Sequence, residues 1–187
     1  KNEIYGEFNQ VPLIKKIQVR QELGLDMFKT HILNVGLWTE GKNQKEGVLV
    51  AEELSNRDDI EFHFIGNQAP NFESYWGPIM KDLPKNVRVW GERDDVDKFM
   101  QACDVLMFNS TWECNPLVVR EAINYGMKIL TRDLPQYVGM FDGIITPITE
   151  KPLKDQLLKL IESKDSYKIP EDPISFGEQH LEFYKKV

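Results

Sequence analysis

The stretch "DVLMFNSTWECNPLVVREAINYGMKIL", residues 104–130, has the pattern of a strand, a polar loop, a helix and a second strand. Residues 104–109 are almost continuously apolar, which is typical of a strand buried on both faces of a parallel sheet. The helix is expected to have Asn115 as its N-cap and Pro116 as its first residue, and to end before Gly126. The unit therefore predicts two parallel strands joined by a helix.

Short apolar runs recur along the whole chain, and segments with helical periodicity separate most of them. The strands are expected at residues 31–36, 60–66, 86–91, 104–109, 128–131 and 143–147, each buried on both faces. The helices are expected at residues 45–56, 95–103, 116–126 and 153–163. This alternation predicts an α/β fold, namely a Rossmann-like three-layer α/β/α domain with a parallel sheet of about six strands.

The chain length of 187 residues suits a single domain over residues 1–187. A loose connection at 163–175 leads to an amphipathic segment at 175–187, which we expect to form a tail helix that packs outside this domain. The chain begins at Lys1 and not at a methionine, so we expect it to be a fragment of a longer protein.

The charge and the cysteines exclude several classes of partner. The formal net charge of −7 opposes binding to a polyanion, so no nucleic-acid partner is expected. Cys103 and Cys114 have neither CxxC spacing nor the density of a disulfide scaffold, which favours a reducing, cytoplasmic location. No apolar run approaches the roughly 20 residues that span a bilayer.

Two glutamates flank the start of the helix that follows residues 104–109. In a parallel sheet the loops after the strands meet at one edge, where ligands bind. A helix N-terminus at this edge suits a phosphate, and carboxylates on either side of it suit sugar hydroxyls. Glu113 and Glu121 thus match the layout of a nucleotide sugar, although two solvated surface carboxylates would give the same spacing.

A lysine lies in a second loop at the same edge. Lys42 follows the strand at 31–36 within "NVGLWTEGKNQ". It is either a solvated surface lysine or the charge that neutralises a diphosphate and the departing nucleoside diphosphate.

These two elements together resemble a known family. Residues 32–44 look like the first strand and the Gly-Arg-Leu…Lys-Gly loop, and residues 87–130 like the run through the Glu-x7-Glu signature, of GT-B-fold retaining glycosyltransferases of family 4, the glycosyl transferases group 1. The similarity is to their C-terminal, donor-binding half. Residues 174–187 are similar to the tail helix that crosses back onto the N-terminal domain.

The resemblance implies two catalytic residues, Lys42 at the donor diphosphate and Glu113 at hydroxyls of the transferred sugar. The other implied substrate-binding positions are Gly36 in the first loop, Gly91, Glu92 and Arg93 around the base, the amides of Asn115 and Leu117 at the phosphates, and Glu121 at the ribose.

The resemblance also implies partners. A nucleotide-sugar donor and an N-terminal domain of the same protein are expected, with no cofactor and no metal. The chain alone is expected to be inactive, and any peripheral membrane contact is expected of the N-terminal half. The alternative is a non-catalytic binding or scaffold domain, because Leu37 stands where the family usually has an arginine. A phosphorylase or epimerase of the same fold is a further, less favoured hypothesis.

Three other motifs are given structural interpretations. Asp95 and Asp97 are expected to be helix-start signals and not metal ligands. The loop after residues 31–36 lacks the G-x-G-x-x-G spacing of a dinucleotide site. The three histidines, His31, His63 and His180, are too scattered in the sequence to predict a metal site.

Overall fold

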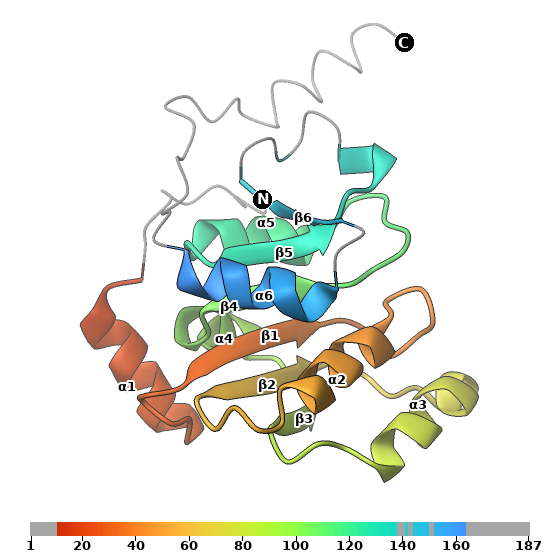
Figure 1. The fold of residues 1–187 in the computed structure, drawn as a ribbon, viewed down its shortest axis with the longest axis horizontal. Helices are drawn as coiled ribbons and strands as arrows, with labels where there is room; N and C mark the ends of the chain where they lie inside the picture. The colour runs from red at the N-terminus through yellow and green to blue at the C-terminus, as the bar shows by residue number, and fades with distance from the viewer. Residues whose placement is uncertain (1–10, 138–140, 142–143, 150–151, 164–187) are drawn as a thin grey trace, which may run out of the picture.

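The computed structural model describes residues 11–137, 141, 144–149 and 152–163 (Figure 1). The strands are β1 (Thr30–Val35), β2 (Ile60–Ile65), β3 (Val87–Gly91), β4 (Val105–Phe108), β5 (Lys128–Arg132) and β6 (Thr146–Ile148). The helices are α1 (Leu13–Leu23), α2 (Gln44–Glu53), α3 (Glu73–Lys81), α4 (Val96–Ala102), α5 (Leu117–Asn124) and α6 (Leu153–Glu162), with short 3-10 turns at Pro70–Phe72 and Pro135–Tyr137. The tail helix predicted at 175–187 lies outside the described residues.

All six strands are parallel, and their order in the sheet is β3-β2-β1-β4-β5-β6. The predicted α/β fold with a six-stranded parallel sheet is therefore confirmed. The chain builds outward from β1 to β3 and then continues on the other side of β1 with β4. This reversal creates a topological switch point between β1 and β4, where the loop after β1 leads to α2 on one face of the sheet and the loop after β4 leads to α5 on the other.

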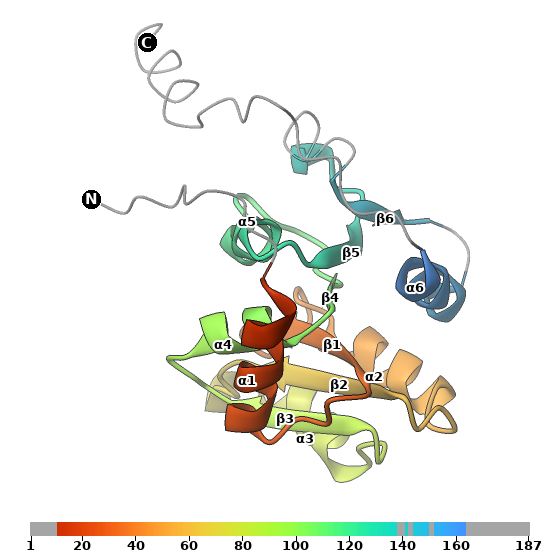
Figure 2. The same ribbon diagram turned by 90° about the vertical axis from the view of Figure 1, so that its left-hand side faces the viewer.

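Helices cover both faces of the sheet (Figure 2). On one face α2, α3 and α6 enclose a core centred on Trp38 and Phe64. On the other face α1, α4 and α5 enclose a core that includes Phe99, Leu106 and Ile129. None of the helices in the described residues is long and apolar enough to cross a membrane.

The two edge strands differ from the prediction. Residues of β3 and β6 are partly exposed and not buried on both faces, because each of these strands has a neighbour on one side only. The sixth strand begins at Thr146 and not at residue 143, since a turn comes first, in which the Ile144 amide donates to the Phe141 carbonyl at 2.9 Å. Pro147 is tolerated in β6 because an edge strand has one unpaired side.

Two helices were not predicted. Helix α1 is docked by a buried charge: the Arg20 guanidinium donates to the Ala102 carbonyl and to Asp104 Oδ2, both at 2.8 Å. Because a charged residue docks α1, the sequence of this helix shows little hydrophobic periodicity. Helix α3 contains Pro78 in its interior, a weak helix former, and packs its aromatic residues Tyr75 and Trp76 against the core.

Candidate functional site

The loops after β1 and β4 are joined directly at the switch point. The Thr111 amide donates to the Gly41 carbonyl at 2.8 Å, and the Thr111 hydroxyl approaches the same carbonyl at 3.2 Å. The loop after β2 also lies close, because a Cβ on Gly66 would stand 1.9 Å from the Gly36 carbonyl oxygen. Only glycine fits at position 66, and the three loops form one continuous edge.

Lys42 and Glu113 meet at this edge. The Lys42 ammonium forms an ion pair with Glu113 Oε1, and the Ser110 hydroxyl donates to the same oxygen at 2.6 Å. The lysine stem runs past Gly36, where a Cβ would lie 3.5 Å from it, and Nζ is 5.2 Å from the centre of the Phe108 ring. The structure therefore brings together three of the predicted site residues from two loops.

The two partners differ in exposure. The side chain of the buried residue Glu113 is 11% exposed, whereas the side chain of Lys42 is 31% exposed. Within the described part of the chain, no donor reaches the other carboxylate oxygen of Glu113. The pair thus combines a held carboxylate with an ammonium that solvent and a ligand can approach.

A second ion pair supports the same loops and was not foreseen. The Arg132 guanidinium, at the end of β5, donates to both oxygens of Glu46 in the first turn of α2 at 2.7 Å. Asn109 and Asn43 donate to Glu46 Oε2 at 2.8 and 3.1 Å. One carboxylate thereby ties the loop that carries Lys42 to the ends of β4 and β5.

Helix α5 begins one residue later than predicted. Pro116 has φ −77° and ψ 84°, outside the helical region, so the first helical residue is Leu117. Asn115 does not cap the helix: its Oδ1 accepts from Arg120 Nε at 3.0 Å, and its carbonyl accepts from the Leu117 amide at 2.9 Å. The predicted cap pair is therefore wrong, because the extended proline leaves the asparagine side chain pointing at Arg120 instead of at the first-turn amides.

The end of α5 agrees with the prediction. Gly126 has φ 67°, and its amide donates to the Ile123 carbonyl at 2.9 Å. The Met127 amide donates to the Ala122 carbonyl at 3.1 Å, which completes a Schellman C-cap. Glu121 is exposed on this helix.

The predicted base-binding loop follows β3 on the same edge. Gly91 adopts φ 70°, and its carbonyl accepts from the Gly66 amide at 2.8 Å. The Arg93 guanidinium binds both oxygens of Asp95 at 2.7 and 2.8 Å, and this interaction lowers the pKa of Asp95. Asp95 occupies the position before α4, as predicted, but its side chain binds Arg93 and does not cap the helix.

A second polar cluster lies on the face of the sheet that α1 and α4 cover. The register of β1 and β2 places His31 opposite Glu61, and His63 two residues further along the same face. Trp90 Nε1 donates to His63 Nδ1 at 3.1 Å, so His63 carries its proton on Nε2. That proton is donated to His31 Nδ1 at 2.8 Å, and His31 Nε2 donates to the Asp26 carbonyl at 2.7 Å.

Burial lowers the pKa of both histidines, that of His63 to about 3. Glu61 accepts from Arg88 Nε at 2.6 Å through Oε1, while its buried Oε2 has no hydrogen-bond partner among the described residues and lies 3.7 Å from His31 Nδ1 and 4.0 Å from His63 Nε2. This spacing resembles a metal site, but a metal on His63 Nε2 needs the proton on Nδ1, where the Trp90 N–H already points. The hydrogen bonds therefore fit a neutral histidine relay and not a metal.

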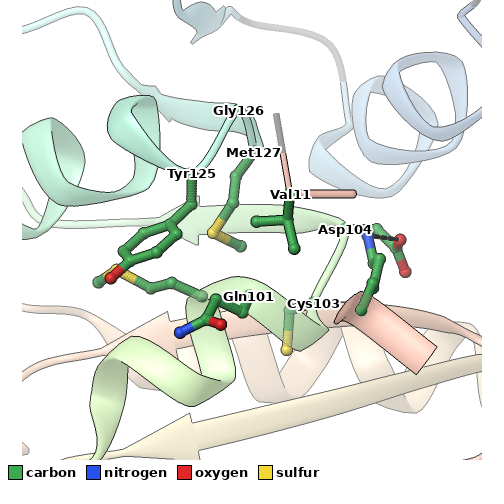
Figure 3. Close-up of a pocket in the computed structure, with 9 residues that line it drawn as sticks. Val11, Gln101, Cys103, Asp104, Tyr125, Gly126 and Met127 are labelled. Atoms are coloured by element: carbon green, nitrogen blue, oxygen red, sulfur yellow. Dashed lines mark hydrogen bonds and ion pairs between the residues drawn. The ribbon is translucent and has the colours of Figure 1, made fainter. Parts of the chain in front are cut away.

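A pocket of about 160 Å³ lies at the opposite edge of the sheet, between the start of α1 and the ends of α4 and α5 (Figure 3). Its charged groups are already paired: Asp104 Oδ1 accepts from Lys16 Nζ at 2.6 Å and Oδ2 from Arg20 at 2.8 Å. This pocket is remote from the switch point, so it is not part of the Lys42–Glu113 site.

Residues 15–179 match the family model described as glycosyl transferases group 1. The chain belongs to this glycosyltransferase family. The match covers both loops of the Lys42–Glu113 site and the whole of the sheet. No curated protein sequence matches the chain.

Several solved structures share the fold. WaaG, a glycosyltransferase involved in lipopolysaccharide biosynthesis, has 24% sequence identity and a TM-score of 0.61 over 79% of this chain and 40% of its own. Anabaena HepE, crystallised with UDP, has 16% identity and a TM-score of 0.71 over 96% of this chain and 56% of its own. TarM has 16% identity and a TM-score of 0.62 over 84% of this chain and 30% of its own. The chain of this family member thus spans between 30% and 56% of these proteins.

Proposed function

We propose that the chain is the donor-binding domain of a two-domain glycosyltransferase. It binds a nucleotide-diphosphate sugar at the switch point and, with an N-terminal domain, transfers the sugar with retention of configuration. The observation that carries this proposal is the meeting of Lys42 and Glu113, 71 residues apart in the sequence, at the switch point of a glycosyltransferase-family fold.

The donor diphosphate would lie against Lys42 and the N-terminus of α5. Sugar transfer develops negative charge on the departing nucleoside diphosphate, and a fixed ammonium stabilises that charge. The side chain of Lys42 is 31% exposed at this edge, which makes it accessible to phosphate oxygens. The N-terminus of α5 adds the positive end of the helix dipole, although the Leu117 amide already donates to the Asn115 carbonyl at 2.9 Å.

Glu113 would bind hydroxyls of the transferred sugar. A buried carboxylate held by the Ser110 hydroxyl is a fixed acceptor for paired hydroxyl groups. Its role is to orient the sugar and not to attack it, in keeping with the resemblance that assigns it. Glu121, exposed on α5, would bind the ribose.

The base would lie at the loop of Gly91, Glu92 and Arg93. The Arg93 guanidinium is bound to Asp95, and Glu92 accepts from Asn67, so the backbone of this loop is the more available recognition surface. Uridine is the first base to test, because HepE was crystallised with UDP and with UDP-glucose.

A calorimetric titration of the 187-residue chain against UDP, GDP, ADP and their sugar conjugates tests this proposal. We expect saturable binding of one nucleoside diphosphate, weakened at least about tenfold by Lys42→Met, because one phosphate-binding charge is removed. Lys85→Met is the matched control: Lys85 pairs with Asp58 at 3.0 Å at the opposite edge, and its loss should leave binding unchanged. No binding of any of these nucleotides would contradict the proposal.

One observation favours a non-catalytic donor-binding domain as the second candidate. Leu37, at the position where the resemblance expects an arginine, is 38% exposed at this edge. Sugar transfer by the full-length protein would separate the two candidates. Leu37→Arg should tighten binding of the nucleoside diphosphate if the missing charge is what limits it.

A further inference from the structure

The two residues assigned to the donor bind each other in the structure. Lys42 Nζ contacts Glu113 Oε1, the same oxygen that accepts from Ser110 at 2.6 Å. The contact that Lys42 would make with a phosphate is therefore already made with a carboxylate of this chain. A diphosphate that binds Lys42 therefore competes with Glu113 for the ammonium and replaces it, fully or in part, as its partner.

This replacement differs between the intact donor and the nucleoside diphosphate alone. A nucleotide sugar brings hydroxyl groups that can donate to the carboxylate as it leaves Lys42. A nucleoside diphosphate lacks the transferred sugar and its hydroxyl groups, so when Glu113 leaves Lys42 the Ser110 hydroxyl is the one donor that the described residues still offer it.

We propose that Glu113 is a specificity-determining residue that lets the site distinguish an intact nucleotide sugar from the nucleoside diphosphate product. This inference rests on the proposed function and adds to it the sequence in which Glu113 changes partners. Donor binding moves the carboxylate from Lys42 to the sugar hydroxyls. Once the sugar has been transferred, the carboxylate returns to Lys42 and competes the nucleoside diphosphate off the site.

Glu113→Gln tests the exchange with little change in side-chain volume. The amide can still accept a hydroxyl hydrogen bond, but it no longer competes as an anion for Lys42. We expect calorimetry to show that UDP binds about tenfold more tightly to the variant, whereas UDP-glucose does not gain in parallel. The ratio of the dissociation constant of UDP to that of UDP-glucose should therefore fall by about tenfold.

A gain in UDP affinity is a readout that damage to the fold does not produce. Asp58→Asn is the matched control, since it removes the same charge from the Lys85–Asp58 pair at the opposite edge and should leave both affinities unchanged. The gain should disappear in the double variant Lys42→Met, Glu113→Gln, because it depends on the released ammonium.

The outcomes separate this inference from the proposed function. If UDP binds the unchanged chain and binds Glu113→Gln with equal or lower affinity, the exchange is overturned. The donor site is then still supported. Failure of UDP, GDP, ADP and their sugar conjugates to bind either protein would overturn the proposed function and the exchange with it.

Discussion

The sheet carries two polar clusters of opposite character. In the cluster of His31, Glu61 and His63 the groups come from strands, and each histidine nitrogen has one fixed partner. At the switch point, Lys42 and Glu113 come from loops and pair with each other at a solvent-open edge. The closed cluster is therefore expected to contribute to stability, whereas the paired groups at the open edge can exchange their partners for groups of a ligand.

The largest loss of stability is expected for His63→Ala. The side chain is fully buried, and its removal leaves a cavity and takes away the acceptor of Trp90 Nε1 and the donor to His31. We expect the free energy of unfolding to fall by about 3 to 4 kcal/mol in urea denaturation. Nucleotide binding by the remaining folded protein should not change. A loss below about 1 kcal/mol would show that the relay does not hold the sheet together.

Acid should act on the same cluster without a mutation. The pKa of His63 is about 3 in the folded chain, below the value of 6.5 for an ordinary histidine, so the unfolded chain takes up the proton first. Stability from this group is complete above about pH 6.5, falls as the pH drops through the window from 6.5 to about 3, and changes no further below it. Between pH 6 and pH 4 we expect a loss of about 2 to 3 kcal/mol, measured by urea denaturation. His63→Ala should reduce this pH dependence, and an equal slope in the variant would assign it to other groups.

The sequence was sufficient for the fold class because alternating apolar runs and helical periodicity are local signals. It could not supply the strand order, which decides that the loops of Lys42 and Glu113 meet. The histidine cluster was missed for the same reason: His31 and His63 are 32 residues apart and come together only through the register of β1 and β2. The spacing of residues along the chain does not show which strands lie side by side.

In the candidate site, too, residues in local motifs were predicted and long-range contacts were missed. Lys42 and Glu113 were found because each belongs to a motif within a single loop. Arg132 and Glu46 were not, since their ion pair joins positions 86 residues apart and neither has a local motif. The cap at Asn115 failed because Pro116 adopts an extended conformation that residue preferences do not fix.

Arg132→Met tests whether the open edge has structural support of its own. The change removes the donor to both oxygens of Glu46 and to the Asn109 carbonyl, at 3.1 Å, while the aliphatic stem remains. The two side chains are about 30% exposed, so we expect a loss of about 1 to 2 kcal/mol in urea denaturation. Nucleotide affinity should fall moderately, because the loop of Lys42 is less well held. Unchanged affinity with lowered stability would mean that this ion pair serves the fold alone.

Lys42→Met should have the smallest effect on stability and the reverse relation to binding. Methionine keeps an aliphatic stem beside Gly36, and the buried Glu113 keeps the Ser110 hydroxyl as its donor, so the free energy of unfolding should fall by only about 1 kcal/mol. The same change should weaken nucleotide binding at least about tenfold, whereas His63→Ala should lower the stability strongly and leave binding unchanged. Urea denaturation measures the stability of these two variants, and calorimetry measures their nucleotide affinity. Lys85→Met is the control for a lost surface charge. If Lys42→Met destabilises the chain as strongly as His63→Ala, the Lys42–Glu113 pair is a structural tie, and the division between a closed cluster and an open, exchangeable edge does not hold.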